Sequence, residues 1–216
     1  MADTIHEDHP DFARFAADGA VVAYFGYGSL VNKATLRTRF LAIRRAEVTG
    51  WRRFWLPREA PLAAYLSVRP EPGHPTQGVV VYDLADHLAL VDEREAGYRR
   101  IAVESGAIRI EAAPGIEVPV FLYEALKGEE TAADAGCFLL QSYLDAVLQG
   151  FLALYGEAGL RRFVAETDGF ETDIVADRPE PRYPRSVTLA AGEAVLFDRL
   201  LRERGARFVE TAGEWL

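Results

Sequence analysis

The chain has 216 residues, of which 50% are hydrophobic and 26% are charged, a composition typical of a globular protein and not of a disordered chain. Its 33 acidic and 24 basic residues give a net charge of −9. This charge argues against nucleic acid and against anionic membrane surfaces as partners, because both are recognised by basic faces. The length predicts one or two domains, and since no boundary is evident we expect one domain over residues 1–216.

The cysteine content and the hydropathy pattern narrow the class of protein further. The single cysteine, Cys137, excludes an intramolecular disulfide and a multi-cysteine metal site, so no metal is expected and Cys137 is interpreted as a small core residue. Residues 1–18 lack the basic start and apolar centre of a signal peptide. The sequence contains no run of 18 apolar residues, so it predicts no membrane span. The sequence therefore favours a cytoplasmic protein.

The first part of the chain predicts a short helix, a strand, a glycine-rich loop and a second helix. Residues 12–17 have helical character, and the apolar run 21–25 predicts a buried strand. The loop Gly26-Tyr27-Gly28-Ser29-Leu30 follows, and residues 32–40 predict a helix with Asn32 as its N-cap. The proline-rich stretch 69–75 predicts a loop between strands expected at residues 44–55, 64–68 and 78–84.

The middle of the chain predicts one helix and more strands. Residues 86–95 are interpreted as a helix and residues 98–104 as a strand. Residues 108–111 and 118–126 are expected to pair as a hairpin around a Pro-Gly turn. Six or more strands with two early helices predict an α+β fold whose sheet is curled and largely antiparallel, or closed into a barrel.

The last third of the chain changes to helical periodicity. Apolar residues recur at helical spacing over residues 132–165, which Gly156 and Gly159 are expected to break into two helices. Residues 177–185 contain three prolines and predict a stiff loop, and residues 193–204 predict a final helix. We therefore expect a C-terminal extension, residues 157–216, that is mainly helical.

The glycine-rich loop is the first candidate for chemistry. Glycines before a helix allow the backbone to approach a ligand closely, and free N–H groups at a helix N-terminus bind carboxylate or phosphate. A dinucleotide fingerprint is excluded because position 31 is Val31. A nucleophile elbow is excluded because Ser29 lacks glycines two residues away on each side. An ordinary tight turn remains the alternative.

The second candidate is the charged segment over residues 92–99. Asp92 and Glu95 share one face of the predicted helix. A carboxylate beside a partly apolar surface can have a raised pKa and serve as general acid or base. The alternative interpretation is a solvated, charged helix end.

The two candidates in this order resemble one family. Tyr27-Gly28-Ser29-Leu30 after a first strand, followed about 65 residues later by the segment from Leu90 to Glu95 and by Tyr98, is similar to the γ-glutamylcyclotransferases, with the closest resemblance to the bacterial, ChaC-like and AIG2-like branches. Residues 50–54, 78–82, 120–123 and 142–150 also resemble family segments. The resemblance covers roughly residues 21–156.

The resemblance implies a small mixed, mostly antiparallel β-barrel flanked by helices. It implies an enzyme that needs no cofactor and converts a γ-glutamyl amide to 5-oxoproline and a free amine. By the same resemblance Glu95 is the catalytic residue. Glu93 is the fallback if the helix register is shifted by two residues. The implied substrate-binding residues are Tyr27, Gly28, Ser29, Leu30, Tyr123 and Tyr143.

The residues fit this chemistry, but they leave other functions open. In the cyclisation the α-amine of the substrate attacks its own γ-carbonyl, and one carboxylate can move the proton from that amine to the leaving nitrogen. A non-catalytic ligand-binding or interaction module, and a γ-glutamyl amide hydrolase, are the alternatives. The expected partner is a small γ-glutamyl molecule, and both a monomer and a homodimer are open. In a weaker hypothesis, Arg178, Arg182 and Arg185 of the proline-rich loop contact a substrate carboxylate.

Overall fold

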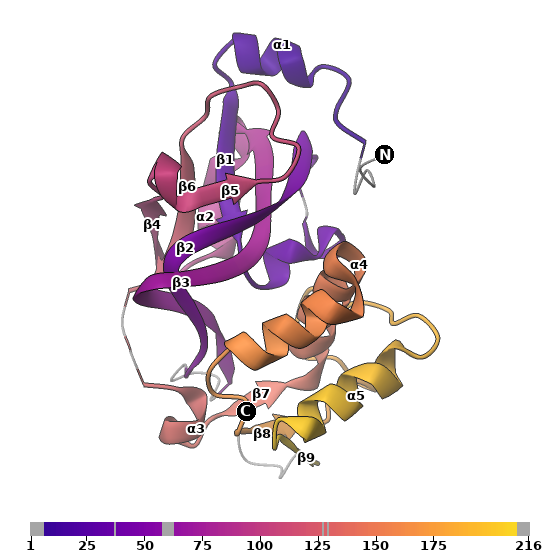
Figure 1. The fold of residues 1–216 in the computed structure, drawn as a ribbon. Coiled ribbons are helices and arrows are strands. Elements are labelled where there is room, and N and C mark those ends of the chain that lie inside the picture. The colour runs from indigo at the N-terminus through magenta and orange to yellow at the C-terminus, as the bar shows by residue number, and fades with distance from the viewer. Residues whose placement is uncertain (1–6, 37, 58–62, 127, 129, 211–216) are drawn as a thin grey trace. The chain divides into compact units, whose positions relative to one another are not determined.

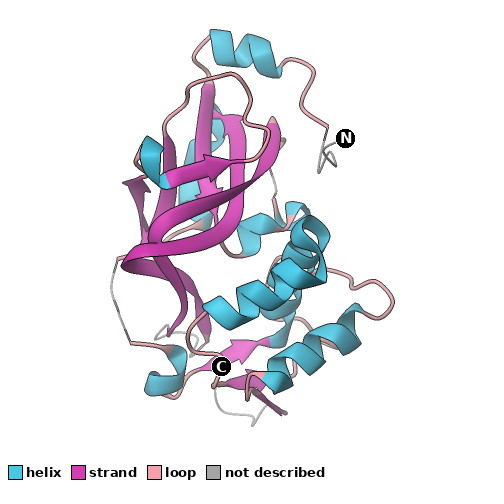
Figure 2. Cartoon of the chain, in the orientation of Figure 1, coloured by secondary structure: helices cyan, strands magenta, loops and turns pink. Residues whose placement is uncertain are grey.

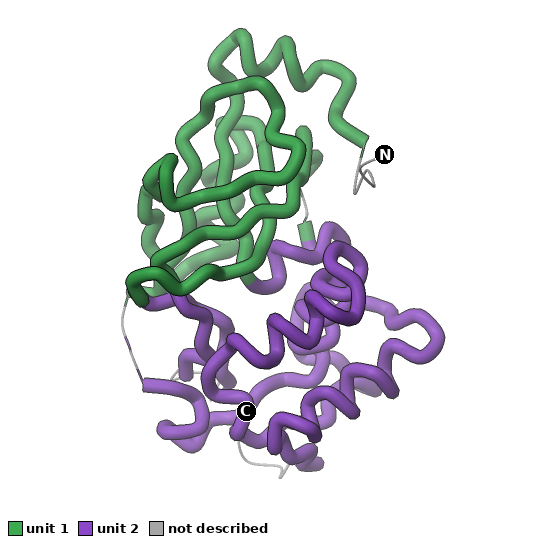
Figure 3. Tube along the Cα trace, in the orientation of Figure 1, with its two compact units in different colours: residues 1–27, 36–51, 70–126 green, residues 28–35, 52–69, 127–216 purple. Residues whose placement is uncertain are grey.

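The computed structural model describes residues 7–36, 38–57, 63–126, 128 and 130–210, and Figures 1 and 2 show its elements. The backbone forms two compact units (Figure 3). The first unit comprises residues 1–27, 36–51 and 70–126, and the second comprises residues 28–35, 52–69 and 127–216. The single domain expected from the sequence stays a prediction.

Six strands form one sheet in the order β4-β6-β1-β3-β2-β5. They are β1 (Val21–Gly26), β2 (Ala42–Pro57), β3 (Ala64–Leu84), β4 (Tyr98–Ala102), β5 (Ile108–Ile110) and β6 (Val120–Ala125). The β1–β3, β2–β5 and β4–β6 pairs are antiparallel, whereas β1 and β6 are parallel. This arrangement confirms the predicted α+β fold with a mixed, mostly antiparallel sheet. The strands β2 and β3 each continue from the first unit into the second.

The predicted barrel is wrong in one respect, because the sheet is not closed. Within the described residues, β4 pairs only with β6, and β5 pairs only with β2, so these two strands are the edges of the sheet. A barrel requires its first and last strands to pair. With three residues, β5 forms one short ladder.

Two local predictions in the sheet are also wrong. Residues 69–75 lie inside β3 and not in a loop. Pro70 and Pro72 are exposed and Pro75 is partly buried, so the prolines avoid the buried part of this long strand, and Gly73 takes a positive φ of 80°. The expected hairpin between residues 108–111 and 118–126 does not form. Instead β5 pairs with β2, and β6 pairs with β1 and β4.

Helices of the first unit match the predictions well. The helix α1 (Phe12–Ala17) is present. The predicted helix at residues 86–95 is a 3₁₀ turn, Ala85–His87, followed by α2 (Leu88–Arg94). In the core of this unit, the apolar residues of β1 pack with Val79, Val80 and Val81 of β3, and each of these valines has 0% exposure.

The predicted helix over residues 32–40 is wrong. Two 3₁₀ turns replace it, Ser29–Val31 and Lys33–Thr35. Polar side chains compete with helical hydrogen bonds here. The Asn32 Oδ1 accepts from the Ala34 N–H at 3.0 Å, and the Thr35 hydroxyl donates to the Ser29 carbonyl at 2.6 Å.

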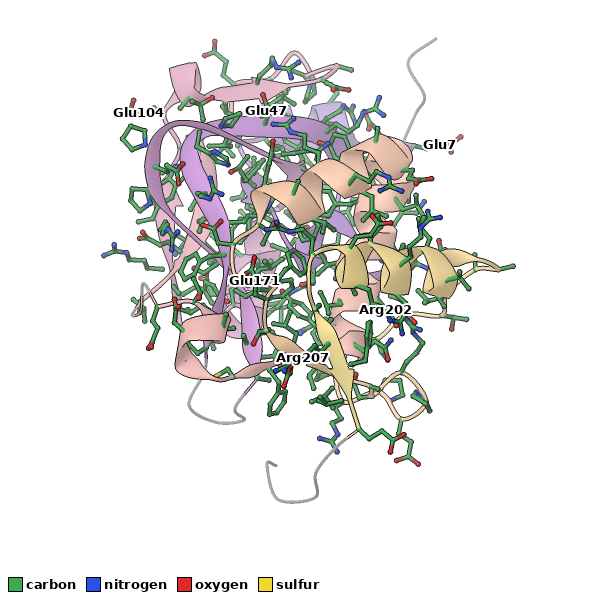
Figure 4. All side chains as sticks on the ribbon, turned by 60° about the horizontal axis from the view of Figure 1, so that its bottom comes forward. Glu7, Glu47, Glu104, Glu171, Arg202 and Arg207 are labelled. Atoms are coloured by element: carbon green, nitrogen blue, oxygen red, sulfur yellow. The ribbon has the colours of Figure 1, made fainter. Side chains whose placement is uncertain are left out.

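The second unit contains a parallel three-stranded sheet in the order β7-β8-β9. The elements are α3 (Ala132–Ala135), β7 (Phe138–Leu140), α4 (Gln141–Glu166), β8 (Asp173–Val175), α5 (Glu193–Glu203) and β9 (Arg207–Val209). The helices α4 and α5 are the crossovers that parallel strands require. The extension predicted as helical therefore also contributes β8 and β9. Figure 4 labels Arg202 on α5 and Arg207 on β9, and Arg207 forms a 2.8 Å ion pair with Asp173 of β8.

The long helix α4 is interrupted once. Gly156 has φ of 65° and ψ of −174° inside it, a conformation that glycine adopts without steric cost. The predicted break at Gly156 is confirmed, whereas Gly159 remains helical. The two parts of the helix contribute Phe151 and Phe163 to the core of the unit, and the rings of these residues stack at 4.3 Å.

Candidate active site

The predicted site residues divide between the two units. Tyr27, Glu95 and Tyr123 belong to the first unit. Residues 28–30 and Tyr143 belong to the second unit. Within each unit, long-range folding brings the members into one cluster. Among the described residues, no group of three His, Cys, Asp or Glu side chains could hold a metal ion, and no helix is long and apolar enough to cross a membrane.

In the second unit, the glycine loop lies against Tyr143 of α4. A Cβ atom at Gly28 would lie 3.1 Å from the Leu66 Cδ1 and 3.5 Å from the Tyr143 hydroxyl. A side chain at position 28 would therefore require the Leu66 side chain to shift by a few tenths of an ångström, so the loop lies close to these side chains. In the described part of the chain, no acceptor is present for the N–H groups of Gly28 and Leu30. The loop can therefore offer two backbone donors to an anionic or carbonyl ligand.

Asn32 fixes the loop on α4. Its Nδ2 donates to the Ala146 carbonyl at 2.8 Å and to the Gln149 Oε1 at 3.1 Å. The Asn32 side chain, expected to cap a helix, instead joins the loop to a helix more than a hundred residues away in sequence. Sequence reasoning missed this role because the partner is distant in the chain.

Tyr143 lies in a cluster of aromatic rings. Its ring centroid is 4.9 Å from that of Tyr65, 4.8 Å from that of Tyr183 and 5.8 Å from that of Trp55, which it meets edge to face. Tyr143 is 5% exposed. Since edge-to-face and tilted pairs at these distances are attractive, the surrounding rings restrict the movement of the Tyr143 side chain.

In the first unit, Tyr27 and Tyr123 are hydrogen-bonded. The Tyr27 hydroxyl donates to the Tyr123 carbonyl at 2.5 Å, which joins the end of β1 to β6. The Tyr123 hydroxyl donates to the Asp92 Oδ1 at 2.7 Å. The phenol of Tyr27 therefore has a structural partner, whereas the phenol of Tyr123 reaches Asp92 of α2, the helix that Glu95 directly follows.

Glu95 lies immediately after α2, where its N–H donates to the Val91 carbonyl at 2.9 Å. Its side chain is 17% exposed, and the Arg94 Nε lies 3.0 Å from its Oε1. Glu93, the fallback residue, is exposed. The half-buried, ion-paired position of Glu95 makes it the better-placed acid or base of the two.

The carboxylates of Asp92 and Glu95 influence the pKa of the Tyr123 hydroxyl. Burial raises the pKa of Tyr123 most, and the Asp92 hydrogen bond and the charges of Asp92 and Glu95 raise it further, whereas Arg100 lowers it. Burial and, to a smaller extent, the two carboxylates thus favour the protonated phenol, which donates the hydrogen bond to Asp92. Glu95, Asp92 and Tyr123 therefore form one electrostatic cluster.

A buried network that sequence reasoning missed anchors the start of α2. Asp83 has 0% exposure and accepts hydrogen bonds from the Tyr24 and Thr38 hydroxyls and from its neighbour's N–H. The His87 Nδ1 lies 2.6 Å from the Asp83 Oδ1. His87 directly precedes α2, so the network fixes the beginning of the seven-residue helix that ends beside Glu95. The four-residue spacing of Asp83 and His87 was the available signal.

The proline-rich loop only partly fits the weaker hypothesis about its arginines. Arg178 is bound by two carboxylates, those of Asp145 and Asp198, at 2.7 and 2.8 Å. Arg182 is exposed. The Nε of Arg185 is buried, and no hydrogen-bond partner for it is seen among the described residues. The guanidinium group of Arg178 is therefore engaged in ion pairs within the protein.

The fold is that of solved gamma-glutamyl cyclotransferase structures. One structure, a gamma-glutamyl cyclotransferase, is 16% identical, with a TM-score of 0.50 over 83% of this chain and 99% of its own. An uncharacterized protein from Homo sapiens is also 16% identical, with a TM-score of 0.51 and the same coverage. At these identities the likeness concerns the fold alone.

The family follows from the sequence match. The family model described as gamma-glutamyl cyclotransferase, AIG2-like, matches residues 24–139, which is more than half of the chain. The chain belongs to this family, which confirms the resemblance. The matched residues include Tyr27, the glycine loop, Glu95 and Tyr123. A search of curated proteins finds no match.

Proposed function

We propose that this protein is a γ-glutamylcyclotransferase that acts without a cofactor. It converts a γ-glutamyl amide to 5-oxoproline and releases an amine or amino acid. Membership of the family supports the reaction class. The single observation that carries the proposal is the position of Glu95, half-buried at the end of α2, paired with Arg94 and electrostatically coupled to Tyr123.

In the proposed mechanism, Glu95 moves one proton. The free α-amine of the substrate attacks its own γ-carbonyl carbon, which forms the carbon–nitrogen bond of the five-membered ring. Glu95 takes the proton that the amine loses and gives it to the leaving nitrogen as the amide bond breaks. Such general acid–base assistance accelerates a reaction by about 10²–10⁴-fold, and holding the amine near the carbonyl adds the advantage of an intramolecular reaction.

The substrate-binding roles rest on the loop and the two tyrosines. The N–H groups of Gly28 and Leu30, for which the described residues provide no acceptor, can bind the substrate carboxylate or stabilise the oxyanion that forms at the γ-carbonyl. Ser29 shapes the loop between them. We assign Tyr143 and Tyr123 to substrate binding, and Tyr27 to holding Tyr123 in place through its hydroxyl.

A substrate panel tests the reaction class. The purified protein is incubated with glutathione, a γ-glutamyl amino acid and a γ-glutamyl amine, and the products are identified by mass spectrometry. Formation of 5-oxoproline is the expected result. Formation of glutamate instead would establish a hydrolase, and binding without turnover would establish a ligand-binding module; either result overturns the proposal.

Two glutamate variants then test the mechanism. Glu95→Gln keeps the size of the side chain and should lower kcat by about 10²–10⁴-fold while the circular dichroism spectrum stays unchanged. Glu93→Gln is the matched control, because Glu93 lies two residues away and is exposed. Wild-type turnover in Glu95→Gln, or an equal loss in both variants, would remove Glu95 from its assigned role.

A further inference from the structure

Asp177 caps the N-terminus of α4 from 35 residues away in the chain. Its Oδ1 accepts from the Ser142 N–H at 2.8 Å, and its Oδ2 accepts from the Ser142 hydroxyl at 2.5 Å. The residue at the N-cap position is Leu140, which has no side-chain acceptor. The first N–H groups of a helix lack intrahelical partners, and a negative charge is favourable at this end. A carboxylate from the C-terminal extension thus completes the start of α4.

The same contact holds Tyr183 next to Tyr143. The Ser142 hydroxyl oxygen accepts from the Tyr183 N–H at 3.2 Å, and the Asp177 Oδ2 also accepts from the Arg182 N–H at 3.0 Å. The Tyr183 ring then makes an edge-type contact with the Tyr143 ring, with centroids 4.8 Å apart and an interplanar angle of 61°. Asp177, Ser142 and Tyr183 are all at most 6% exposed, so water cannot readily replace these hydrogen bonds.

A second set of contacts holds the proline-rich loop, residues 177–185, on α4 one turn further along the helix. Arg178 donates two hydrogen bonds to the Asp145 carboxylate, at 2.7 and 2.8 Å, and it also contacts Asp198 of α5. Asp145 is 3% exposed. The loop is therefore bound to the first two turns of α4 on both sides of Tyr143, and a shift of the loop would release one face of the tyrosine ring.

These contacts matter because Tyr143 also touches the glycine loop, where its hydroxyl lies 3.5 Å from the position of a Gly28 Cβ. We propose that Asp177, Ser142 and Tyr183 are positioning residues that hold Tyr143 for substrate binding. Residues 177–183 of the C-terminal extension then contribute to substrate affinity through Tyr143. This inference rests on the proposed cyclotransferase function. It assigns the three residues no contact with the substrate.

Removal of the Ser142 hydroxyl is the first test. Ser142→Ala breaks the hydrogen bonds to Asp177 and Tyr183 and should raise KM for the γ-glutamyl substrate roughly tenfold, the effect of about 1.4 kcal/mol, with kcat changed less than about twofold. Thr172→Val is the matched control, because it also removes a buried hydroxyl, one that donates to the Cys137 carbonyl at 2.6 Å. Its KM should equal that of the wild type, and thermal melting of both variants is measured alongside.

Asp177→Asn and the Tyr183 pair complete the test. Asp177→Asn keeps the side-chain volume and should raise KM as Ser142→Ala does. Tyr183→Ala should raise KM, and Tyr183→Phe, which keeps the ring contact with Tyr143, should restore most of the lost affinity. This rescue separates a positioning effect from a general loss of stability.

The outcomes distinguish this inference from the proposed function. If the wild type forms no 5-oxoproline from any substrate of the panel, both fall together. If the wild type is active but Ser142→Ala and Asp177→Asn retain the KM of Thr172→Val, the inference alone is overturned. A loss of kcat in proportion to a loss of folded protein would also overturn it, since a purely structural role predicts that pattern.

Discussion

Gly150 of α4 and Asn32 approach each other more closely than any side chain at position 150 would allow. A Cβ on Gly150 would lie 2.7 Å from the Asn32 backbone nitrogen and 2.9 Å from its Cα. Because backbone atoms form the obstacle, they can yield only if the loop after β1 moves. This contact, together with the Asn32 hydrogen bond to Ala146, places the glycine loop on α4.

Gly150→Ala should therefore destabilise the protein by about 1–3 kcal/mol, the usual cost of overpacking. Intrinsic helix propensity alone predicts the opposite sign, a gain of about 1 kcal/mol. Urea denaturation measures the difference. Gly106→Ala is the control, because a Cβ there meets nothing within 4 Å, and it should change stability by less than about 0.5 kcal/mol. A stabilised Gly150→Ala variant would contradict the close contact.

Arg178→Met should cost about 3 kcal/mol, because it leaves the buried Asp145 carboxylate without its ion-pair partner. Burial already raises the pKa of Asp145, against the lowering effect of Arg178. The folded chain therefore binds the Asp145 proton more tightly than the unfolded chain, and the contribution of Asp145 to stability falls as the pH rises. The cost of Arg178→Met should be smaller at pH 5 than at pH 8. Unfolding free energies at the two pH values measure this, and adding Asp145→Asn should recover part of the loss.

The protein should lose stability above about pH 10, the ordinary pKa of a tyrosine. Burial is the largest cause that raises the pKa of both Tyr24 and Tyr123. Above pH 10 the unfolded chain releases these phenol protons while the folded chain retains them, so the unfolding free energy falls by up to about 1.4 kcal/mol per pH unit for each group. Tyr24→Phe should make the dependence less steep. An unchanged slope in denaturation experiments between pH 9 and 11 would contradict the assignment for Tyr24.

Cys137 should react slowly with iodoacetamide. Burial, and then the charge of Glu130, raise the pKa of its thiol, and only the thiolate is nucleophilic. We expect alkylation at pH 8 to be at least about tenfold slower than for a free cysteine, and to reach the free rate when the chain is unfolded in urea. Mass spectrometry of timed samples measures both rates. Equal rates in folded and unfolded protein would show that the thiol is accessible.

Several features of the site could be predicted from the sequence because the information is local. The apolar run before the glycine loop forms the predicted strand, β1. The helix predicted at residues 86–95 is found as α2, next to Glu95. The break at Gly156 could be predicted because a glycine interrupts a long helical pattern there, and the positive φ of this residue confirms it. Periodicity and turn chemistry act over a few residues, so they are visible in the chain itself.

The sequence by itself thus determined the α+β class, the glycine loop after the first strand, and the short helix that directly precedes Glu95. Only the tertiary structure decided which strands pair, that residues 69–75 continue β3, and that Asp177 and Tyr183 hold the start of α4. The physical reason is separation along the chain. These contacts join residues that are tens of residues apart, and their free energy depends on which buried donors and rings the whole fold brings together.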